Sequence, residues 1–150
     1  MIVRPARPDE AGLLTALCKR SKAHWGYDAD FMAKSETSLT ITPELIAGGN
    51  ILVAEDRGHV VGVASLAAID ENTFDLLHMF TEPNAIGTGV GRLLFRNVAA
   101  LAKGQGAKLL SILADPNAEA FYTRMGARKV SMAPSDAIEG RLLPLLEFDL

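Results

Sequence analysis

Three glycines alternate along one short stretch of the chain, at Gly87, Gly89 and Gly91. The stretch follows an apolar segment with the composition of a strand and precedes residues at helical spacing, so it is expected to join a strand to a helix. Without Cβ atoms, its backbone can approach a ligand closely. The free N–H groups at the start of a helix, together with the helix dipole, bind anions such as phosphate. This spacing therefore predicts an anion-binding turn.

Two nucleotide-binding motifs can be compared with this stretch, and neither fits. A dinucleotide fingerprint requires glycines at its first, third and sixth positions, but the sixth position counted from Gly87 is Arg92. A P-loop requires Gly-Lys followed by Ser or Thr, and the chain has no such triplet. The remaining interpretations are a phosphate site of another kind and a glycine-rich turn without a ligand.

The same stretch resembles the acetyl-CoA-binding motif of the GNAT acetyltransferase superfamily, in which Arg/Gln-x-x-Gly-x-Gly/Ala follows a strand and opens a long helix. Pro83, Gly89 and Gly91 are in register with that motif. Ile86 stands where the family usually has Arg or Gln. The resemblance therefore implies coenzyme A binding that lacks one side-chain contact and is weaker for it.

A second block, residues 115–127, is similar to the later motif of that family, Asn-x-x-Ala-x-x-Phe-Tyr followed by x-x-x-Gly-Phe. The matching residues are Ala118, Phe121, Tyr122 and Gly126. Asp115 stands where Asn is usual and Ala127 where Phe is usual, so an amide contact to the pantetheine arm would come from Asn117 or be lost. Two motifs in the right order are more specific than either alone, and the resemblance spans nearly the whole chain.

The resemblance implies that acetyl-CoA is the cosubstrate and that it lies along both motifs. The backbone of Met79, Phe80 and Thr81 would pair with the pantetheine arm, and Asn117, Phe121 and Tyr122 would also contact the cofactor. The pyrophosphate would be held by backbone N–H groups of the turn, which belong to Ile86, Gly87, Thr88, Gly89, Val90, Gly91 and Arg92.

Acetyl transfer from a thioester requires a neutral amine, a donor to the oxyanion and a proton for the departing thiolate. By resemblance, Tyr122 protonates the coenzyme A sulfur; the alternative is an aromatic ring packed under its helix. The oxyanion donor is expected to be a backbone N–H near Phe80 or Thr81. Asp75 and His78 are candidates for the general base, the alternative for Asp75 being a solvated turn residue. Strand alternation places them on opposite faces, so at most one would face the thioester.

His24, Trp25 and Tyr27 are predicted to line the acceptor pocket, because the region between the first helices often does so in this family and aromatic rings bind amines by cation–π contacts. An aromatic plug that anchors the chain is the alternative. Arg141 could bind an acceptor carboxylate in bidentate fashion, or it could be a surface charge. Cys18, on an apolar helix face, is assigned no nucleophilic role.

Hydrophobic periodicity supplies the elements that would position these residues. Strands are predicted at 2–4, 51–55, 60–67, 74–81 and 108–113, followed by a last pair around a loop at 134–140. Helices are predicted after residue 8, through 31–32, over 90–101 and from 115 to about 125. The fold class is thus α/β (α+β), with a single mixed, mainly antiparallel central sheet flanked by helices, in one domain over 1–150.

Composition narrows the classes of function. The 150 residues are 49% apolar and 22% charged, as in ordinary globular domains. The net charge of −3 comes from interspersed residues without a Lys/Arg block, so neither nucleic acid nor a membrane is an expected partner. A single cysteine and scattered histidines predict no disulfide and no metal. No apolar run has the length of a signal peptide or a membrane span, which predicts a cytoplasmic protein.

The sequence thus predicts an N-acetyltransferase that moves the acetyl group from acetyl-CoA to a primary amine of a small molecule, by direct attack in a ternary complex. One alternative is a non-catalytic acetyl-CoA-binding sensor or interaction module, which the departures at Ile86 and Asp115 favour. Another is a protein or peptide N-acetyltransferase. Related proteins are often dimers, so a homodimer is also expected.

Overall fold

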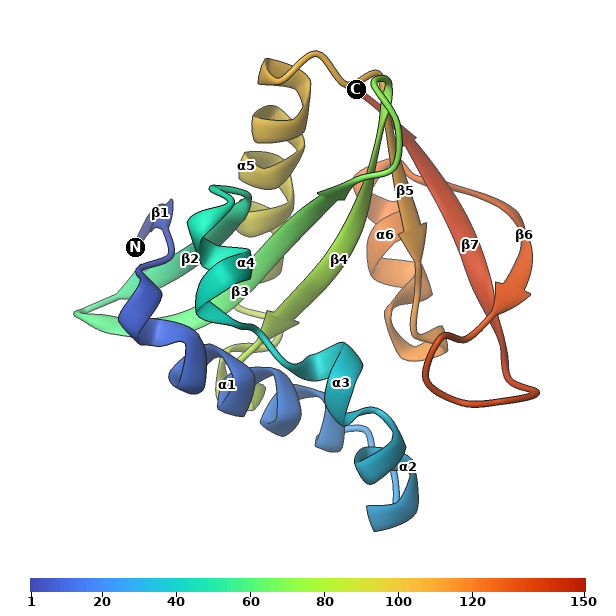
Figure 1. The fold of residues 1–150 in the computed structure, drawn as a ribbon, viewed down its shortest axis with the longest axis horizontal. Coiled ribbons are helices and arrows are strands. Elements are labelled where there is room, and N and C mark those ends of the chain that lie inside the picture. Colours follow the sequence, from blue (N-terminus) through green and yellow to red (C-terminus); the bar gives the residue numbers. More distant parts are fainter.

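The computed structural model describes residues 1–150, and its centre is one seven-stranded sheet (Figure 1). The strands are β1 (Ile2–Pro5), β2 (Ile51–Asp56), β3 (His59–Ala68), β4 (Thr73–Thr81), β5 (Leu109–Leu113), β6 (Arg128–Pro134) and β7 (Leu142–Asp149). Their spatial order is β1-β2-β3-β4-β5-β7-β6, and β4 with β5 is the one parallel pair. The prediction of a single mixed, mainly antiparallel sheet is confirmed.

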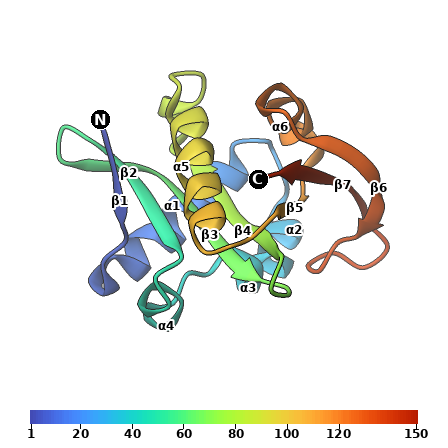
Figure 2. The ribbon, with the colours of Figure 1, turned by 90° about the horizontal axis from the view of Figure 1, so that it is seen from above.

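Helices lie on both sides of this sheet (Figures 1 and 2). They are α1 (Ala11–Ala23), α2 (Ala29–Lys34), α3 (Glu36–Leu39), α4 (Pro43–Ala47), α5 (Val90–Gly104) and α6 (Glu119–Met125), with 3-10 turns at Pro8–Glu10, Pro83–Ala85 and Pro116–Ala118. Helices α3 and α4 were not predicted, because four or five residues are too few to show a helical period. None of the helices has both the length and the apolar composition that crossing a membrane would require.

Neighbouring residues of the central strands are buried in two different cores. Val53 and Val63 belong to the core that includes residues of α1, whereas Ala54 and Ala64 belong to the core that includes residues of α5. Because side chains alternate across a strand, α1 and α5 must cover opposite faces of the sheet. Strands buried on both faces appear in the sequence as continuous apolar runs, which is why these segments were recognisable as strands.

Strands β4 and β5 separate partway along their length (Figure 1). They pair only where Thr73–Asp75 lies beside Leu109–Ser111, although β4 continues to Thr81 and β5 to Leu113. On their outer sides both strands remain paired, β4 with β3 and β5 with β7. The sheet therefore opens beyond Asp75 into a V-shaped gap.

An irregularity in β4 lies beside the vertex of this gap. The register with β3 shifts between Ser65 and Leu66, which leaves Leu77 without a partner. An extra residue in one strand interrupts the alternation of side chains. Asp75 and His78 consequently point into the same cavity on one side of the sheet. The prediction that they lie on opposite faces is wrong, because it assumed a regular strand.

The close approach of α5 to β3 depends on the absence of a side chain at Gly62. A Cβ atom there would lie 2.6 Å from Leu94 Cδ1 and 3.0 Å from Val90 Cγ1, and both of these side chains are buried in the core. We expect Gly62→Ala to lower the free energy of unfolding by roughly 1–3 kcal/mol through overpacking. Denaturant unfolding measures this change.

Gly12→Ala is the matched control for that substitution. Gly12 lies in α1, with nothing within 4 Å of a Cβ atom placed there. Because Ala is the better helix former, this variant should be more stable than the wild type by roughly 0.5–1 kcal/mol. Equal stability of the two variants would contradict the packing argument.

Candidate active site

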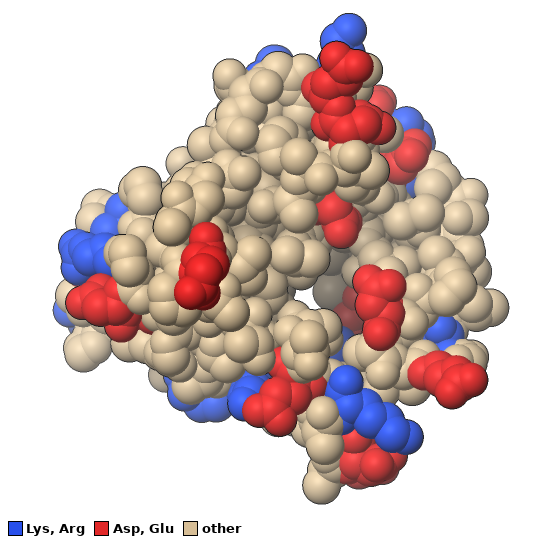
Figure 3. Space-filling view, viewed as in Figure 1, with Lys and Arg blue, Asp and Glu red and all other residues tan.

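Two cavities meet at the gap between β4 and β5. The larger, about 820 Å³, is bounded by β4, the turn that follows it, α5 and α6. The smaller, about 280 Å³, is bounded by α2, α3, β4 and the β6–β7 loop. Both cavities are lined by Lys22, Leu76, Leu77, Phe80 and Leu113. Figure 3 shows the surface hollowed between β4 and β5, near this junction. The gap in the sheet therefore connects the two cavities.

The turn before α5 presents backbone amides to the larger cavity. Gly87 and Gly89 have φ angles of 82° and 93°, a left-handed conformation that glycine adopts without strain. Gly89 is the N-cap of α5, and no side chain caps this helix. The amides of Val90, Gly91 and Arg92 have no hydrogen-bond partner within the chain. Uncapped amides at the positive end of a 15-residue helix form an anion site.

Two residues of the turn that was predicted to bind the pyrophosphate do not line the larger cavity. The Thr88 amide donates to Ala85 O at 3.2 Å, and its hydroxyl donates to the same oxygen. The side chain of Val90 is buried in the core, 2% exposed, although its amide is free. Thr88 therefore closes the turn and has no N–H left for a ligand, which corrects the prediction for this residue. Ile86 lines the cavity, but its amide donates to Pro83 O at 3.4 Å, so the prediction that this N–H binds the pyrophosphate is corrected as well.

Positive side chains that the sequence reasoning missed also line the larger cavity. Arg96 follows Arg92 by one turn of α5, and Arg124 comes from α6. Arg92, Arg96 and Arg124 are all exposed, and none of them has a carboxylate partner within the chain. The i, i+4 spacing of Arg92 and Arg96 was a signal that could have found the second of them. Together with the amides, these charges suit a ligand with several phosphates.

One edge of β4 faces the gap with unpaired backbone groups. The Glu82 amide donates to Val61 O at 2.9 Å. In an antiparallel ladder every second residue pairs with the same neighbour, so Phe80 is directed to β3 while Met79 and Thr81 are directed to β5. Strand β5 has already diverged at this level. The amides of Met79 and Thr81 are therefore free to meet an extended ligand.

Tyr122 of α6 lies at the inner end of the larger cavity. The side chain is buried, 6% exposed, with its ring 6.0 Å from Phe95 and 5.2 Å from Phe121. Its hydroxyl has no hydrogen-bond partner within the chain, yet it is not among the buried atoms cut off from solvent. Burial, and then the charge of Asp115, raise the pKa of Tyr122. The phenol therefore keeps its proton and faces the cavity.

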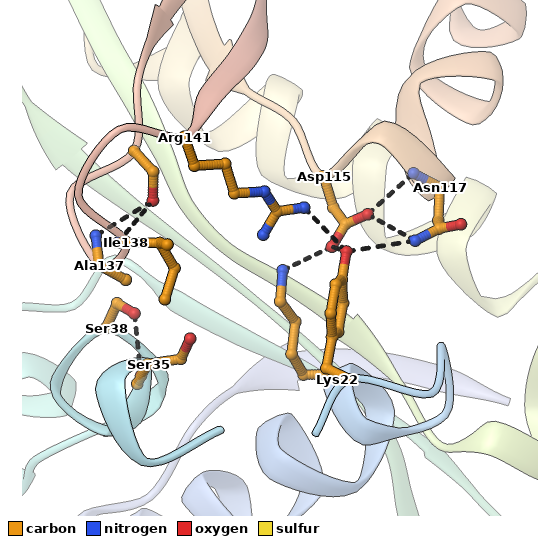
Figure 4. Close-up of polar contacts among 10 residues, drawn as sticks. Lys22, Ser35, Ser38, Asp115, Asn117, Ala137, Ile138 and Arg141 are labelled. Atoms are coloured by element: carbon orange, nitrogen blue, oxygen red, sulfur yellow. Dashed lines mark hydrogen bonds and ion pairs between the residues drawn. The ribbon is translucent and has the colours of Figure 1, made fainter. Parts of the chain in front are cut away.

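A polar network separates the two cavities on the side of α1 (Figure 4). The Asp115 carboxylate accepts from Lys22 Nζ at 2.6 Å and from the Tyr27 hydroxyl at 2.8 Å. It also accepts from both nitrogens of Asn117, at 2.8 and 2.9 Å. Burial opposes the charge of Asp115, but the bonds from Lys22 and Asn117 outweigh it and lower the pKa. Asp115, the departure from the family motif, thus joins α1 to the start of α6.

The smaller cavity contains the two candidates for the base. Burial, and then the charge of Asp136 on the β6–β7 loop, raise the pKa of Asp75. Burial lowers the pKa of His78 to about 4, so its imidazole is neutral. His78 Nδ1 lies 2.7 Å from Ser65 Oγ, whereas Nε2 is buried without a hydrogen-bond partner.

The residues predicted for the acceptor pocket are distributed differently. His24 is exposed and lines neither cavity, and Trp25 lines the larger cavity; both residues follow the end of α1 at Ala23. Tyr27 lines neither cavity, since its hydroxyl is engaged by Asp115 and by Arg141 Nη2, 2.9 Å away. Arg141 does line the smaller cavity, over the rings of Tyr27 and Phe31.

Comparison with known proteins agrees with this architecture. A family model described as an acetyltransferase (GNAT) domain matches residues 47–126, more than half of the chain. No curated protein sequence matches. Among solved structures, a GCN5-related N-acetyltransferase from Rhodopseudomonas palustris is 23% identical with a TM-score of 0.81, over 99% of this chain and 95% of that one.

Two further structures share the fold. The PaiA N-acetyltransferase from Thermoplasma acidophilum, in complex with coenzyme A, is 14% identical with a TM-score of 0.80, over 99% of this chain and 98% of that one. A ribosomal-protein-alanine N-acetyltransferase from Brucella melitensis is 21% identical with a TM-score of 0.71, over the full length of both chains. The chain belongs to the GNAT acetyltransferase family and is an acetyl-CoA-dependent N-acetyltransferase.

Proposed function

We propose that the larger cavity binds acetyl-CoA, that the smaller cavity binds a small-molecule primary amine, and that the amine attacks the thioester directly in a ternary complex. The junction of the two cavities at the gap in the sheet carries this proposal. Two ligands that enter from different sides can meet there while both remain bound. A volume of about 280 Å³ lies just below the usual range for small-molecule sites, which suits a small acceptor.

The chain's groups around the larger cavity fit the parts of coenzyme A. The amides at the start of α5 would bind the pyrophosphate, and Arg92, Arg96 and Arg124 would add charge-assisted contacts to its phosphates. The free amides of Met79 and Thr81 would pair with the pantetheine arm as a neighbouring strand does. Acetyl-CoA, when bound, supplies the activated acetyl group.

Asp75 is the residue that we assign as general base. It is the last residue of β4 that pairs with β5, so it lies at the vertex of the gap. A raised pKa makes it a better proton acceptor than an ordinary carboxylate. Burial lowers the pKa of His78 to about 4, which makes its imidazole a weaker base than that of an ordinary histidine. A backbone amide of β4 beside the bulge at Leu77, where the strand faces the gap, would donate to the acetyl oxygen.

Release of free thiol from acetyl-CoA tests the reaction. We expect thiol to appear only when an amine is added, and the acetylated amine to accumulate in equal amount. Calorimetric binding of coenzyme A without thiol release from any amine would instead indicate a sensor. Acetylation of peptides but not of small amines would indicate a protein acetyltransferase.

Gly89→Ala tests whether the backbone amides at the start of α5 bind coenzyme A. A residue with a Cβ atom in the left-handed conformation is strained by roughly 1–2 kcal/mol, so the turn should relax and the amides should move. We expect the Kd for coenzyme A, measured by calorimetry, to rise about tenfold. Gly49→Ala is the control, because Gly49 has a similar φ of 82° but lines neither cavity. If Gly89→Ala and Gly49→Ala had the same Kd for coenzyme A, the proposal that the amides at the start of α5 bind its pyrophosphate would be wrong.

A further inference from the structure

The charged groups of the smaller cavity are incompletely paired. Asp75 and Asp136 make no side-chain hydrogen bond or ion pair within the chain, and Arg141 has no carboxylate partner. Asp75 and Arg141 are partly buried, so their unpaired charges are partly desolvated and a ligand of complementary charge would stabilise them, whereas Asp136 is exposed to solvent. Lys22, the other charged lining residue, is already neutralised by Asp115. The cavity thus offers one free cation and two free carboxylates.

Arg141 is held in place by its neighbours, and they leave most of its donors free. Nη2 donates to the Tyr27 hydroxyl at 2.9 Å, and the guanidinium lies 5.2 Å from the Tyr27 ring centroid and 4.9 Å from that of Phe31. The two rings stack on each other, with centroids 3.9 Å apart, and the guanidinium lies beside this pair; these contacts and the Tyr27 hydroxyl position it before any ligand arrives. Arginine has five N–H donors in a planar fork, which matches a carboxylate in bidentate fashion.

The loop that carries Arg141 is also ordered. Ser135 Oγ accepts from the amides of Ala137 and Ile138 at 3.2 and 3.1 Å. The Ser135 amide donates to Arg141 O at 2.8 Å. Asp136 lies within this turn and is close enough to Asp75 for the two charges to interact. The loop therefore fixes Arg141 and Asp136 together, over the vertex where Asp75 lies.

One further group of this cavity lacks a partner. His78 Nε2 is buried and makes no hydrogen bond of good geometry, although the Ser38 backbone lies close enough to the imidazole to favour its protonated form; the residue is 3% exposed and lines the cavity. A buried polar atom that is so poorly paired can accept a hydrogen bond from, or donate one to, a polar ligand in the cavity. This observation is independent of the charges.

We propose that the acceptor is a small amino carboxylate, whose carboxylate is bound by Arg141 and whose ammonium group is bound by Asp75 and Asp136. This proposal rests on the function proposed above and specifies its substrate class. The ammonium group gives one proton to the Asp75 carboxylate, and the neutral nitrogen then forms the N–C bond as the C–S bond of the thioester breaks. The thiolate takes its proton from Tyr122, and the second proton that the attacking nitrogen loses on becoming an amide returns to Tyr122, so one proton in all, the one held by Asp75, is released with the amide and the thiol.

The test compares amino acids with their amides as acceptors. The panel consists of the twenty protein amino acids, β-alanine and 4-aminobutanoate, each beside its primary carboxamide, with kcat/KM measured by thiol release. For the best acceptor we expect the acid to exceed its amide by at least about tenfold, because a charge-assisted bidentate contact is lost in the amide. Arg141→Gln should lower kcat/KM for the acid by about 10- to 100-fold but change it for the amide by less than about threefold.

The controls separate this proposal from misfolding and from the general function. Arg141→Lys keeps the charge and should fall between the wild type and Arg141→Gln. Arg7→Gln, at an exposed arginine remote from both cavities, should match the wild type. If amides or simple amines are acetylated as well as the acids, or if Arg141→Gln lowers both equally, the amino carboxylate is excluded while acetyl transfer stands. If no amine is acetylated, both proposals fail.

Discussion

Replacement of Tyr122 by Phe is expected to lower kcat by about 100-fold or more, which is the contribution of a positioned general acid. The hydroxyl faces the larger cavity, has no partner within the chain, and keeps its proton because burial raises its pKa. A departing thiolate within reach of that proton would be neutralised as the C–S bond breaks. Without the hydroxyl, the thiolate would leave with its charge in a site built largely of apolar residues.

The same variant should leave binding and stability nearly unchanged. Since the Tyr122 hydroxyl makes no hydrogen bond within the chain, its removal should alter the free energy of unfolding by less than about 0.5 kcal/mol. The Kd for coenzyme A should also stay close to that of the wild type. Steady-state thiol release, calorimetry and denaturant unfolding measure the three quantities.

Tyr27→Phe is the matched comparison, because it removes the only other tyrosine hydroxyl. That hydroxyl donates to Asp115 and accepts from Arg141, so its loss should loosen Arg141 and raise the KM for the acceptor more than it lowers kcat. A loss of kcat in Tyr122→Phe and a higher KM in Tyr27→Phe would show that Tyr122 donates the proton and that Tyr27 positions Arg141. Wild-type kcat in Tyr122→Phe would rule out the acid role.

The glycine-rich turn could be predicted from the sequence because glycine has few structural substitutes there. Gly87 and Gly89 need a left-handed backbone. Glycine is required at position 91 for a different reason. A Cβ atom there would lie 3.3 Å from Phe121 Cε1 and would push α5 away from α6. The sequence showed the spacing of the three residues but could not tell these causes apart, because φ angles and interhelical contacts exist only in the folded chain.

The shared face of Asp75 and His78 could not be derived from a regular period. A bulge adds a residue without changing composition, and Leu77 is an ordinary apolar residue. One signal was present, because Asp75 and His78 flank two leucines, a pattern that departs from strict alternation of polar and apolar residues. The consequence for function is direct, because Asp75, the proposed base, and the imidazole of His78 line one cavity.

Contacts between distant segments were the other part that sequence reasoning missed. Lys22 and Asp115 are 93 residues apart, and Tyr27 and Arg141 are 114 apart, yet each pair is within hydrogen-bond distance. Asp115 was interpreted as a loss of the family's asparagine. In the fold its charge is neutralised by Lys22, so the substitution adds a link between α1 and α6 at the boundary of the two cavities.

Asp75→Asn is expected to lower kcat/KM by about 100-fold, because the amide cannot take the proton of the ammonium group. In the wild type a carboxylate base works only when it is ionised, so kcat/KM should fall as the pH drops through the pKa of Asp75. That pKa is raised, first by burial and then by Asp136, so the fall should lie above the usual range of an aspartate. Lys22 and Arg141 also face the cavity, as cations, and His78 on the same strand stays neutral above a pH of about 4.

Asp136→Asn distinguishes a base from a neighbouring charge, since it removes one carboxylate from the same cavity but leaves Asp75 in place. Without the negative charge of Asp136, the pKa of Asp75 should decrease, so the loss of kcat/KM in acid should begin at a lower pH. At higher pH, where kcat/KM is constant, the variant should differ from the wild type mainly by a higher KM for the acceptor. Measurement of kcat/KM against pH for the three proteins checks both expectations. A large loss of kcat in Asp136→Asn with little loss in Asp75→Asn would exchange the roles of the two carboxylates. If the wild type and both variants were equally active, the amine would have to lose its proton to solvent. The residues at the vertex of the gap would then position the acceptor but would not deprotonate it.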